Sequence, residues 1–401
     1  MRRLHQARAK QRSCGTDETN TVAKTMKTSV IEIAGAGPAG LAAAVTLAHA
    51  GVSVVVHEAQ AEVGYRFQRD LQGLENWSTE EDVLAVLRNL GIDTDFKMLP
   101  CRKGTVFDAW DRSYGVHSEA PLFYMVERGP GVGSLDNALL QQAIGLGVEV
   151  RYNSRLRQMR GPGIFATGPK SADAVAVGYH FDTPMSDGFW AICDDKLAPQ
   201  GYAYLLVMGG RGTVKSCMFR KTAQTAVYVQ RTVAAFERLA GLEMIDPKPH
   251  GGVGNFNVPH SARSGVHPVV GEQAGFQDTL WGFGMRFAIV SGVLAARSLI
   301  EGSDYDVLWQ QDMGAMMRAS VVNRVAYGLL GNRGYRWALR HQESHPDART
   351  LLQRHYRPSA SKRLLAPLAR WRYRSLRQDA SCHQPDCSCV WCRHGAGHQI
   401  E

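Results

Sequence analysis

The segment VIEIAGAGPAGLAAAVTLAHAGVSVVVHE, residues 30–58, most constrains how this chain folds. A β-branched stretch leads directly into Gly35, Gly37 and Gly40, at G-x-G-x-x-G spacing. Glycines at these positions allow a tight turn, close approach of the backbone to a pyrophosphate, and close packing of a helix on a strand. An alanine-rich helix and a second strand are expected to follow. This order predicts a dinucleotide-binding βαβ unit.

Glu58 follows the second predicted strand and stands 18 residues after Gly40. An acidic residue about 20 residues beyond the glycines commonly accepts hydrogen bonds from a ribose. Glu58 is therefore the candidate ribose ligand, and the N–H groups at the start of the first helix are candidate pyrophosphate ligands. The alternative is a βαβ unit with an empty crevice.

Composition indicates a folded protein, with 44% hydrophobic and 21% charged residues. The longest apolar stretch, residues 281–300, contains two arginines, so no membrane span is expected. Residues 1–28 are polar and lack the apolar core of a secretory signal. We expect a disordered N-terminal extension, with Met26 as an alternative start, and a cytoplasmic protein whose scattered cysteines are reduced.

Basic residues are concentrated near the C-terminus, in a chain of net charge +9. Arginines recur among leucines and aromatic residues between residues 304 and 378, which predicts a basic helical region. One interpretation is an amphipathic segment lying on an anionic membrane surface. A second is nucleic-acid binding through arginine and aromatic stacking, which we do not favour. The third is a solvated helix that packs its leucines on the protein body.

The middle of the chain has the patterns of two further layers. Ser78 and Glu81 form a capping-box pattern that predicts a helix over residues 76–90. Segments 101–122 and 171–254 alternate apolar and polar residues between glycine-containing turns, as in an antiparallel sheet. A helix over 223–242 is expected to follow its strands.

Several later segments are expected to return to the crevice of the first βαβ unit. Arg128 is predicted to end a strand, and residues 164–168 to form another strand that ends in a turn. Gly282 and Gly284 precede a predicted long helix over 285–300. Its start is a second glycine-flanked helix N-terminus with free N–H donors, suited to an anionic ring or a polarised carbonyl.

These stretches together resemble the FAD-dependent oxidoreductases of the geranylgeranyl reductase type, within the superfamily related to p-hydroxybenzoate hydroxylase. The resemblance covers about residues 29–301 and rests on Gly35 to Glu58, on the Ala-Thr-Gly that ends at Gly168, and on the segment from Gly271 to Ala296. Arg128 with Leu135-Asp136 is similar to another element of the family. The resemblance implies an α/β fold, with a doubly wound Rossmann-like FAD domain, an inserted antiparallel β-sheet substrate domain and a helical C-terminal segment.

The resemblance also implies a division of the chain. The predicted parts are an FAD-binding domain over 29–100, 123–170 and 255–303, a substrate domain over 101–122 and 171–254, a basic helical region over 304–378, and a Cys/His-rich tail over 379–401.

The resemblance assigns cofactor contacts to specific positions. The glycines of the first turn would bind the pyrophosphate, Glu58 the ribose, Arg128 the diphosphate or ribityl part, and Glu272 the ribityl hydroxyls, where the family has aspartate. The full predicted set is Gly35, Gly37, Pro38, Ala39, Gly40, Glu58, Ala59, Arg66, Arg128, Thr167, Gly168, Gly271, Glu272, Gly282, Gly284 and Met285.

The predicted substrate side departs from the prenyl reductases of the family. The segment 199–207 keeps Pro199 and Tyr202 of their P-x-x-Y-x-W-x-F-P pattern but not its Trp, Phe and last Pro, and their cysteine near the flavin is absent. The halogenase motif W-x-W-x-I-P is also missing beside Lys215, so halogenation is not expected. Tyr202 is the candidate catalytic proton donor.

Cys382, Cys387, Cys389 and Cys392 cluster in the C-terminal tail with nearby histidines. Four thiolates at this density are candidate Zn²⁺ ligands, or ligands of an iron–sulfur cluster. The one-residue gap between Cys387 and Cys389 matches no standard knuckle, and the alternative is a reduced or redox-active tail.

The sequence therefore predicts an FAD-dependent oxidoreductase that acts on a small hydrophobic molecule, of prenyl, lipid or aromatic type. Reduction of C=C bonds by hydride from flavin N5 is the leading prediction, and aromatic monooxygenation is the alternative. A non-catalytic flavoprotein module with a metal-binding tail is the second alternative. An NAD(P)H or ferredoxin-type donor is expected. No second nucleotide fold is evident in the sequence, so NAD(P)H would bind transiently at the flavin face. The oligomeric state is left open.

Overall fold

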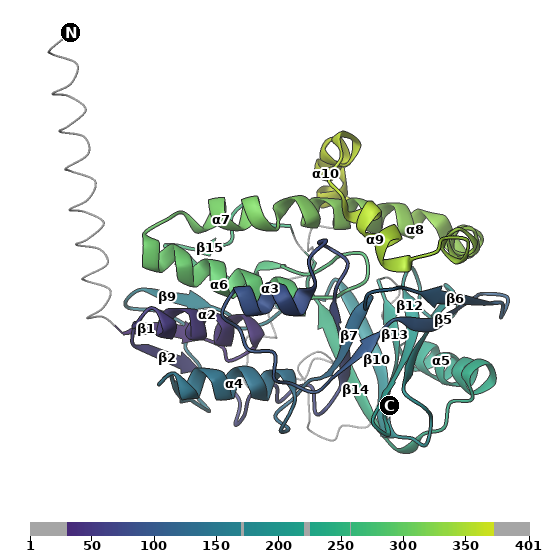
Figure 1. The fold of residues 1–401 in the computed structure, drawn as a ribbon, viewed down its shortest axis with the longest axis horizontal. Helices are drawn as coiled ribbons and strands as arrows, with labels where there is room; N and C mark the ends of the chain where they lie inside the picture. The colour runs from purple at the N-terminus through teal and green to yellow at the C-terminus, as the bar shows by residue number, and fades with distance from the viewer. Residues whose placement is uncertain (1–29, 170–171, 220–224, 257, 373–401) are drawn as a thin grey trace, which may run out of the picture.

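The computed structural model describes residues 30–169, 172–219, 225–256 and 258–372. The extension predicted for residues 1–28 and the four clustered cysteines lie outside these ranges. The described chain has the mixed α/β architecture that the sequence predicts, with a parallel sheet at one end, a large antiparallel sheet at the other, and helices along one side (Figure 1).

The parallel sheet carries the glycine turn. Its two central strands are β-branched and buried, as expected for strands covered on both faces. The strand order is β8 (Glu149–Arg151), β2 (Val54–His57), β1 (Ile31–Ala34) and β9 (Gly163–Phe165). Three helices form the core with it: α2 (Pro38–His49), α4 (Leu135–Gly145) and α6 (Met285–Glu301).

A three-stranded antiparallel sheet lies between the two larger sheets. Its central strand is β7 (Phe123–Glu127), which is buried along its whole length and ends immediately before Arg128. The flanking strands are β3 (Leu71–Glu75) and β4 (Met98–Cys101).

The seven-stranded sheet is antiparallel except for one parallel pair, formed by its strands 103–108 and 188–193. One face packs against helix α5 (Thr225–Ala240), and the other faces the interior of the molecule. The strand order is β14 (Ile245–Gly254), β10 (Ala174–Asp182), β13 (Arg211–Met218), β12 (Tyr202–Met208), β11 (Gly188–Cys193), β5 (Lys103–Asp108) and β6 (Ser113–His117).

Two local features differ from the sequence prediction. The sequence did not indicate β14, whose IDPKPHGGVG segment contains two prolines and three glycines, but an edge strand tolerates proline. The predicted capping box is wrong: helix α3 (Val83–Asn89) starts later and is capped by Asp82, while the Ser78 hydroxyl donates to the Glu75 carboxylate. Strand β14 and the Asp82 cap of α3 both depend on contacts with neighbouring strands.

The predicted basic region is helical through residue 372. These helices run along the top of the molecule in Figure 1, from the parallel-sheet end to the end that carries the large sheet. They are α7 (Tyr305–Asp312), α8 (Gly314–Glu343), α9 (Ala348–Tyr356) and α10 (Ala360–Arg372). The long α8 bends at Gly331, where φ is 58° and ψ is −177°. None of the helices in the described ranges is long and apolar enough to span a bilayer.

Helices α2 and α6 pack so closely that a glycine is required between them. A Cβ added to Gly292 would overlap the backbone of Ala39. We expect Gly292→Ala to lower the free energy of unfolding by about 1–3 kcal/mol, because the overlapping atoms are backbone and cannot move away easily. Thermal unfolding measures this change.

The control is Gly145→Ala in the last turn of α4, where an added Cβ meets no atom within 4 Å. That change is expected to raise stability by up to about 1 kcal/mol, because alanine favours the helix. An unchanged melting temperature for Gly292→Ala would show that the two helices do not approach as described.

Candidate active site

One large cavity joins the parallel sheet to the seven-stranded sheet. Its volume is about 1270 Å³, above the roughly 300–1000 Å³ typical of a pocket for one small ligand. At one end lie the carboxyl ends of β1, β2 and β9, and at the other lie β5, β11, β12 and helices α8 and α9. Every residue of the predicted cofactor-binding set except Gly40 lines it, and so does Tyr202.

The three glycines of the first turn meet different surroundings. A Cβ on Gly35, whose φ is +106°, would overlap the carbonyl of Ala166, and one on Gly40 would overlap the carbonyl of Gly35. Gly37 has an ordinary φ of −77°, and a Cβ there would meet no atom of the described residues within 4 Å. Gly35 and Gly40 thus serve backbone packing, whereas Gly37 keeps free space in the cavity at the N-terminus of α2. The sequence predicts the pyrophosphate in that space.

Glu58 ties the second strand to this turn. Its Oε2 accepts a hydrogen bond from the backbone N–H of Ala36 at 2.9 Å, and Oε1 accepts one from Gln60 N–H at 2.9 Å. The carboxylate lines the cavity while it fixes the conformation of the glycine turn. This position suits a ribose ligand, since a carboxylate can accept more than these two hydrogen bonds.

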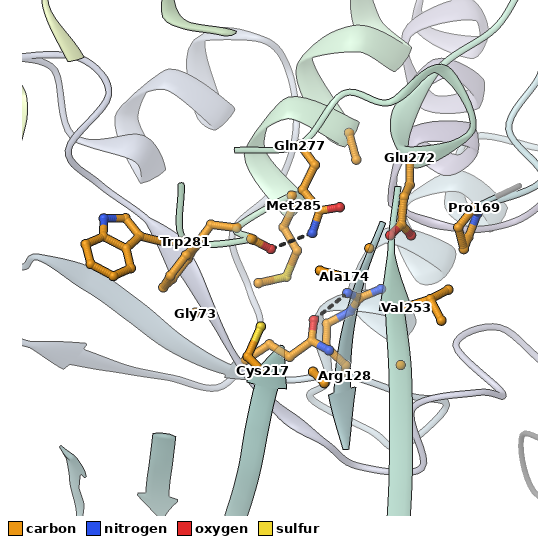
Figure 2. A pocket seen from close by; sticks show the side chains of 18 of the residues that line it. Gly73, Arg128, Pro169, Ala174, Cys217, Val253, Glu272, Gln277, Trp281 and Met285 are labelled. Carbon is orange, nitrogen blue, oxygen red and sulfur yellow. Dashed lines mark hydrogen bonds between the residues drawn. The ribbon is translucent and has the colours of Figure 1, made fainter. Parts of the chain in front are cut away.

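The two predicted arginines lie against one aromatic ring. Arg128 is buried and forms a bidentate pair with Asp136 of α4, at 2.7 and 2.9 Å. Its guanidinium carbon lies 4.0 Å from the ring centroid of Phe67, and that of Arg66 lies 4.6 Å from the same centroid. Arg66 also pairs with Glu272 at 2.9 Å. Both cations are therefore neutralised by carboxylates, and both line the cavity. Figure 2 shows Arg128 and Glu272 at this wall.

The late glycine segment meets the Ala-Thr-Gly turn, as the sequence predicts. Gly271 begins the short helix η2 (Gly271–Ala274) with φ of +63°. Gln273 Oε1 accepts hydrogen bonds from the Thr167 backbone N–H at 2.7 Å and the Thr167 hydroxyl at 2.8 Å. Segments about 100 residues apart thereby form one rim of the cavity.

Gln277 is a site residue that sequence reasoning missed. Its amide nitrogen donates to the carbonyl of Gly282, while its Oε1 is buried and has no hydrogen-bond partner among the described residues. It lies beside Met285 at the start of α6 (Figure 2). A buried acceptor without a donor is costly, so this position fits a ligand that brings an N–H group, as the pyrimidine edge of a flavin does.

Tyr202 lies at the opposite end of the cavity from the glycine turn. Its hydroxyl donates to the carbonyl of Trp281, and the two rings are 5.5 Å apart in a T-shaped arrangement. Burial raises the pKa of Tyr202 well above its usual value. The hydroxyl therefore keeps its proton and donates it in a hydrogen bond to a backbone carbonyl. The walls around it are largely apolar and include Trp77, Phe123, Phe189, Leu206 and Phe283.

The contrast among the glycines generates a prediction for nucleotide binding. We expect Gly37→Ala to weaken FAD binding by at least about tenfold, equivalent to about 1.4 kcal/mol, because the methyl group enters the free space beside the α2 N-terminus. Its thermal stability without cofactor should stay near that of the wild type. Fluorescence titration with FAD and thermal unfolding measure the two quantities.

Gly115→Ala is the matched control, because Gly115 also has open space around its Cβ position but lies on the distant strand β6. FAD affinity equal to the wild type in Gly37→Ala would place the pyrophosphate elsewhere.

Comparison with known proteins agrees with this geometry. Residues 27–163 match the family model described as FAD binding domain. No curated protein matches the chain by sequence. Among solved structures, a geranylgeranyl bacteriochlorophyll reductase-like protein from Thermoplasma acidophilum is similar, with a TM-score of 0.66, 16% identity, and coverage of 86% of this chain and 96% of that one.

Two other solved structures share the fold. The myxobacterial chondrochloren halogenase has a TM-score of 0.56 at 17% identity, with 85% of this chain and 96% of that one covered. The p-nitrophenol 4-monooxygenase of Pseudomonas putida has a TM-score of 0.50 at 14% identity, with 87% and 98% covered. Residues 27–163 are therefore similar to an FAD binding domain, and the chain shares its fold with these solved structures.

Proposed function

We propose that this chain is an FAD-dependent oxidoreductase that reduces C=C bonds in a long apolar substrate of prenyl or lipid type. The cavity is the observation that supports this proposal most directly. It continues from the glycine turn to a chamber lined by aromatic and aliphatic side chains, and its volume leaves room for a chain-like substrate beside a cofactor. The likeness to a reductase-like structure supports the same reading.

The residues at the first end would hold FAD by separate interactions. The α2 N-terminus and Gly37 would receive the pyrophosphate, Glu58 the ribose, and Gln277 an N–H of the ring. Arg66, Arg128 and Glu272 would line the part between them. Bound FAD supplies hydride chemistry, and the protein orients the substrate and excludes water. NAD(P)H or a ferredoxin-type protein would supply the electrons.

Helices α8 and α9 form the outer wall of the apolar chamber. Leu330, Ala338 and Leu339 of α8 and Leu351 and Leu352 of α9 line it. Trp337 also lines the cavity, although its side chain is 65% exposed, so the apolar surface continues from the chamber to the outside. A substrate that is itself apolar could enter by this side without crossing a polar surface.

Helix α10 would bring this side to a membrane. Leu364, Leu368 and Trp371 lie one to two turns apart and are 81%, 64% and 62% exposed, while Ala366 and Ala369 pack on the body. Residues 313–372 contain twelve basic and two acidic residues. An apolar stripe within a basic region suits an anionic bilayer surface.

The proposed reaction predicts a specific product. FAD-loaded protein, reduced chemically without oxygen and mixed with a geranylgeranyl lipid, should yield a product heavier by two hydrogens for each bond reduced, as mass spectrometry detects. In the Ala338→Trp variant the rate of lipid reduction should fall at least about tenfold, because the indole fills the chamber. Its FAD affinity should be unchanged. Ala234→Trp, on the exposed side of α5, is the control.

An aromatic monooxygenase would behave differently. If the protein adds one oxygen atom to a phenol in air, and no reductant yields a reduced lipid, the proposed reductase activity is wrong and the monooxygenase alternative replaces it.

Membrane contact is tested separately. The double variant Leu364→Glu/Leu368→Glu should lose co-sedimentation with phosphatidylglycerol vesicles, because two carboxylates oppose both the apolar and the anionic surface. The control Ile144→Glu/Val307→Glu changes two exposed apolar residues on α4 and α7 and should bind like the wild type. If the wild-type protein does not co-sediment with these vesicles at low salt, the proposed membrane contact is wrong.

A further inference from the structure

A buried ion pair lies in the cavity wall and has no part in the cofactor contacts above. Lys215 Nζ of β13 donates to Asp70 Oδ2 at 2.6 Å, and the two side chains are 2% and 0% exposed. Asp70 also accepts hydrogen bonds from Thr213 at 3.1 Å and Gln72 at 3.0 Å. Both Lys215 and Asp70 line the cavity. A paired buried ion pair is commonly no more stabilising than apolar residues of similar volume, so fold stability alone does not explain this pair at a cavity wall.

The position of Lys215 in the sheet divides the cavity. On one side, β14 and β10 line it with small residues such as Gly251, Gly252 and Ala176. On the other side, β12, β11 and β5 line it with Tyr204, Leu206, Phe189 and Val106. Figure 2 shows the same order, with Val253 and Ala174 near Glu272, Trp281 at the far side, and Cys217 of β13 between them. Lys215 thus stands where the cofactor end meets the apolar chamber.

His250 of β14 adds a proton acceptor to this pair. Its Nε2 lies 2.8 Å from the Arg66 carbonyl, which can only accept, so Nε2 carries the proton. Its Nδ1 then carries no proton. This atom is buried, has no hydrogen-bond partner among the described residues and lies 3.9 Å from Asp70 Oδ2. Three groups that exchange protons therefore line one part of the wall.

We propose that Lys215 is the catalytic acid of the reduction, with Asp70 and His250 as the groups that restore its proton. This role rests on the proposed function. The π bond of the substrate breaks, one carbon takes a hydride from the reduced flavin, and the other takes a proton as the Lys215 Nζ–H bond breaks. Lys215 is left as a neutral amine and regains its proton from solvent by way of His250 and Asp70. Reduced FAD would supply the two electrons, and the NAD(P)H or ferredoxin-type donor would replace them.

The electrostatics of the cluster favour return of the proton. Burial lowers the pKa of His250, and the charge of Lys215 lowers it further, to about 4. Burial raises the pKa of Asp70, but Lys215 and the other partners outweigh it and hold it at about 2. Once Lys215 is neutral, its charge no longer lowers the pKa values of His250 and Asp70. Both groups then bind a proton more strongly. The other titratable groups facing the pair are His180, Tyr204 and Cys217.

The other proton carriers of the chamber are less suited to this role. The Tyr202 hydroxyl donates to a backbone carbonyl. Burial raises the pKa of Tyr204 well above its usual value and that of Cys217 to about 12. Lys215 donates to the Asp70 carboxylate at 2.6 Å, and this ion pair holds its Nζ–H groups at the cavity wall.

Two substitutions separate proton donation from charge. Lys215→Met removes both, whereas Lys215→Arg keeps the charge and the pairing with Asp70 but cannot release a proton. Because Lys215→Met leaves Asp70 buried without its partner, the double variant Lys215→Met/Asp70→Asn serves as its folded counterpart. Lys248→Met changes an exposed lysine of β14 and is the control.

The measurements use FAD-loaded protein, a geranylgeranyl lipid and a chemical reductant, together with FAD titration and NMR titration of His250. We expect both Lys215→Met and Lys215→Arg to lower turnover at least about 100-fold, as for loss of a general acid, with FAD affinity within about twofold. The pKa of His250 should rise in Lys215→Met and remain low in Lys215→Arg.

The outcomes distinguish the two proposals. A wild type that gives no reduced lipid overturns the proposed function and the role of Lys215 with it. A wild type that reduces the lipid, with Lys215→Met or Lys215→Arg equally active, overturns the role of Lys215 alone. An unchanged pKa of His250 in Lys215→Met overturns the proton return.

Discussion

A line of compensated buried charges joins the two ends of this molecule, and the active-site architecture depends on it. Asp136 of α4 pairs with Arg128, and Arg128 donates to the side-chain Oε1 of Gln72 at 3.1 Å. The Gln72 side-chain nitrogen donates to Asp70, which also accepts from Lys215. Removing one partner of a buried pair leaves an uncompensated charge. Each member therefore fixes the next, from the parallel sheet to the large antiparallel sheet.

The same line sets the polarity of the cavity. It runs along the wall beside the loops predicted to bind the cofactor and stops at Lys215 of β13, and beyond β13 the lining becomes aromatic and aliphatic. Charges that are paired and buried attract little water. The apolar chamber can thus begin directly beside a charged wall, and a hydride acceptor could be kept dry next to a proton donor.

Local patterns predicted the cofactor end of the site, and contacts between distant residues decided the rest. The glycine turn and the alternating strands β10 to β13 are visible in sequence because their chemistry is local. Strand β14 was missed because its prolines are tolerated only at an edge. Asp70 and Gln277 have no sequence signal. The partner of Asp70, Lys215, lies 145 residues away in the chain. The partner of Gln277, Gly282, lies in a turn whose shape the sequence does not predict.

The basic C-terminal region divides into two kinds of arginine, which the composition alone could not separate. Arg324 is buried in α8, donates to the carbonyls of Leu280 and Gln200, and lies 4.1 Å from the ring centroid of Phe219. Arg349 of α9 likewise donates to backbone carbonyls of residues 76–80. These inward cations attach the helices that close the apolar chamber. The electrostatic case for a membrane surface therefore rests on the outward basic residues, above all those of α10 beside its exposed leucines.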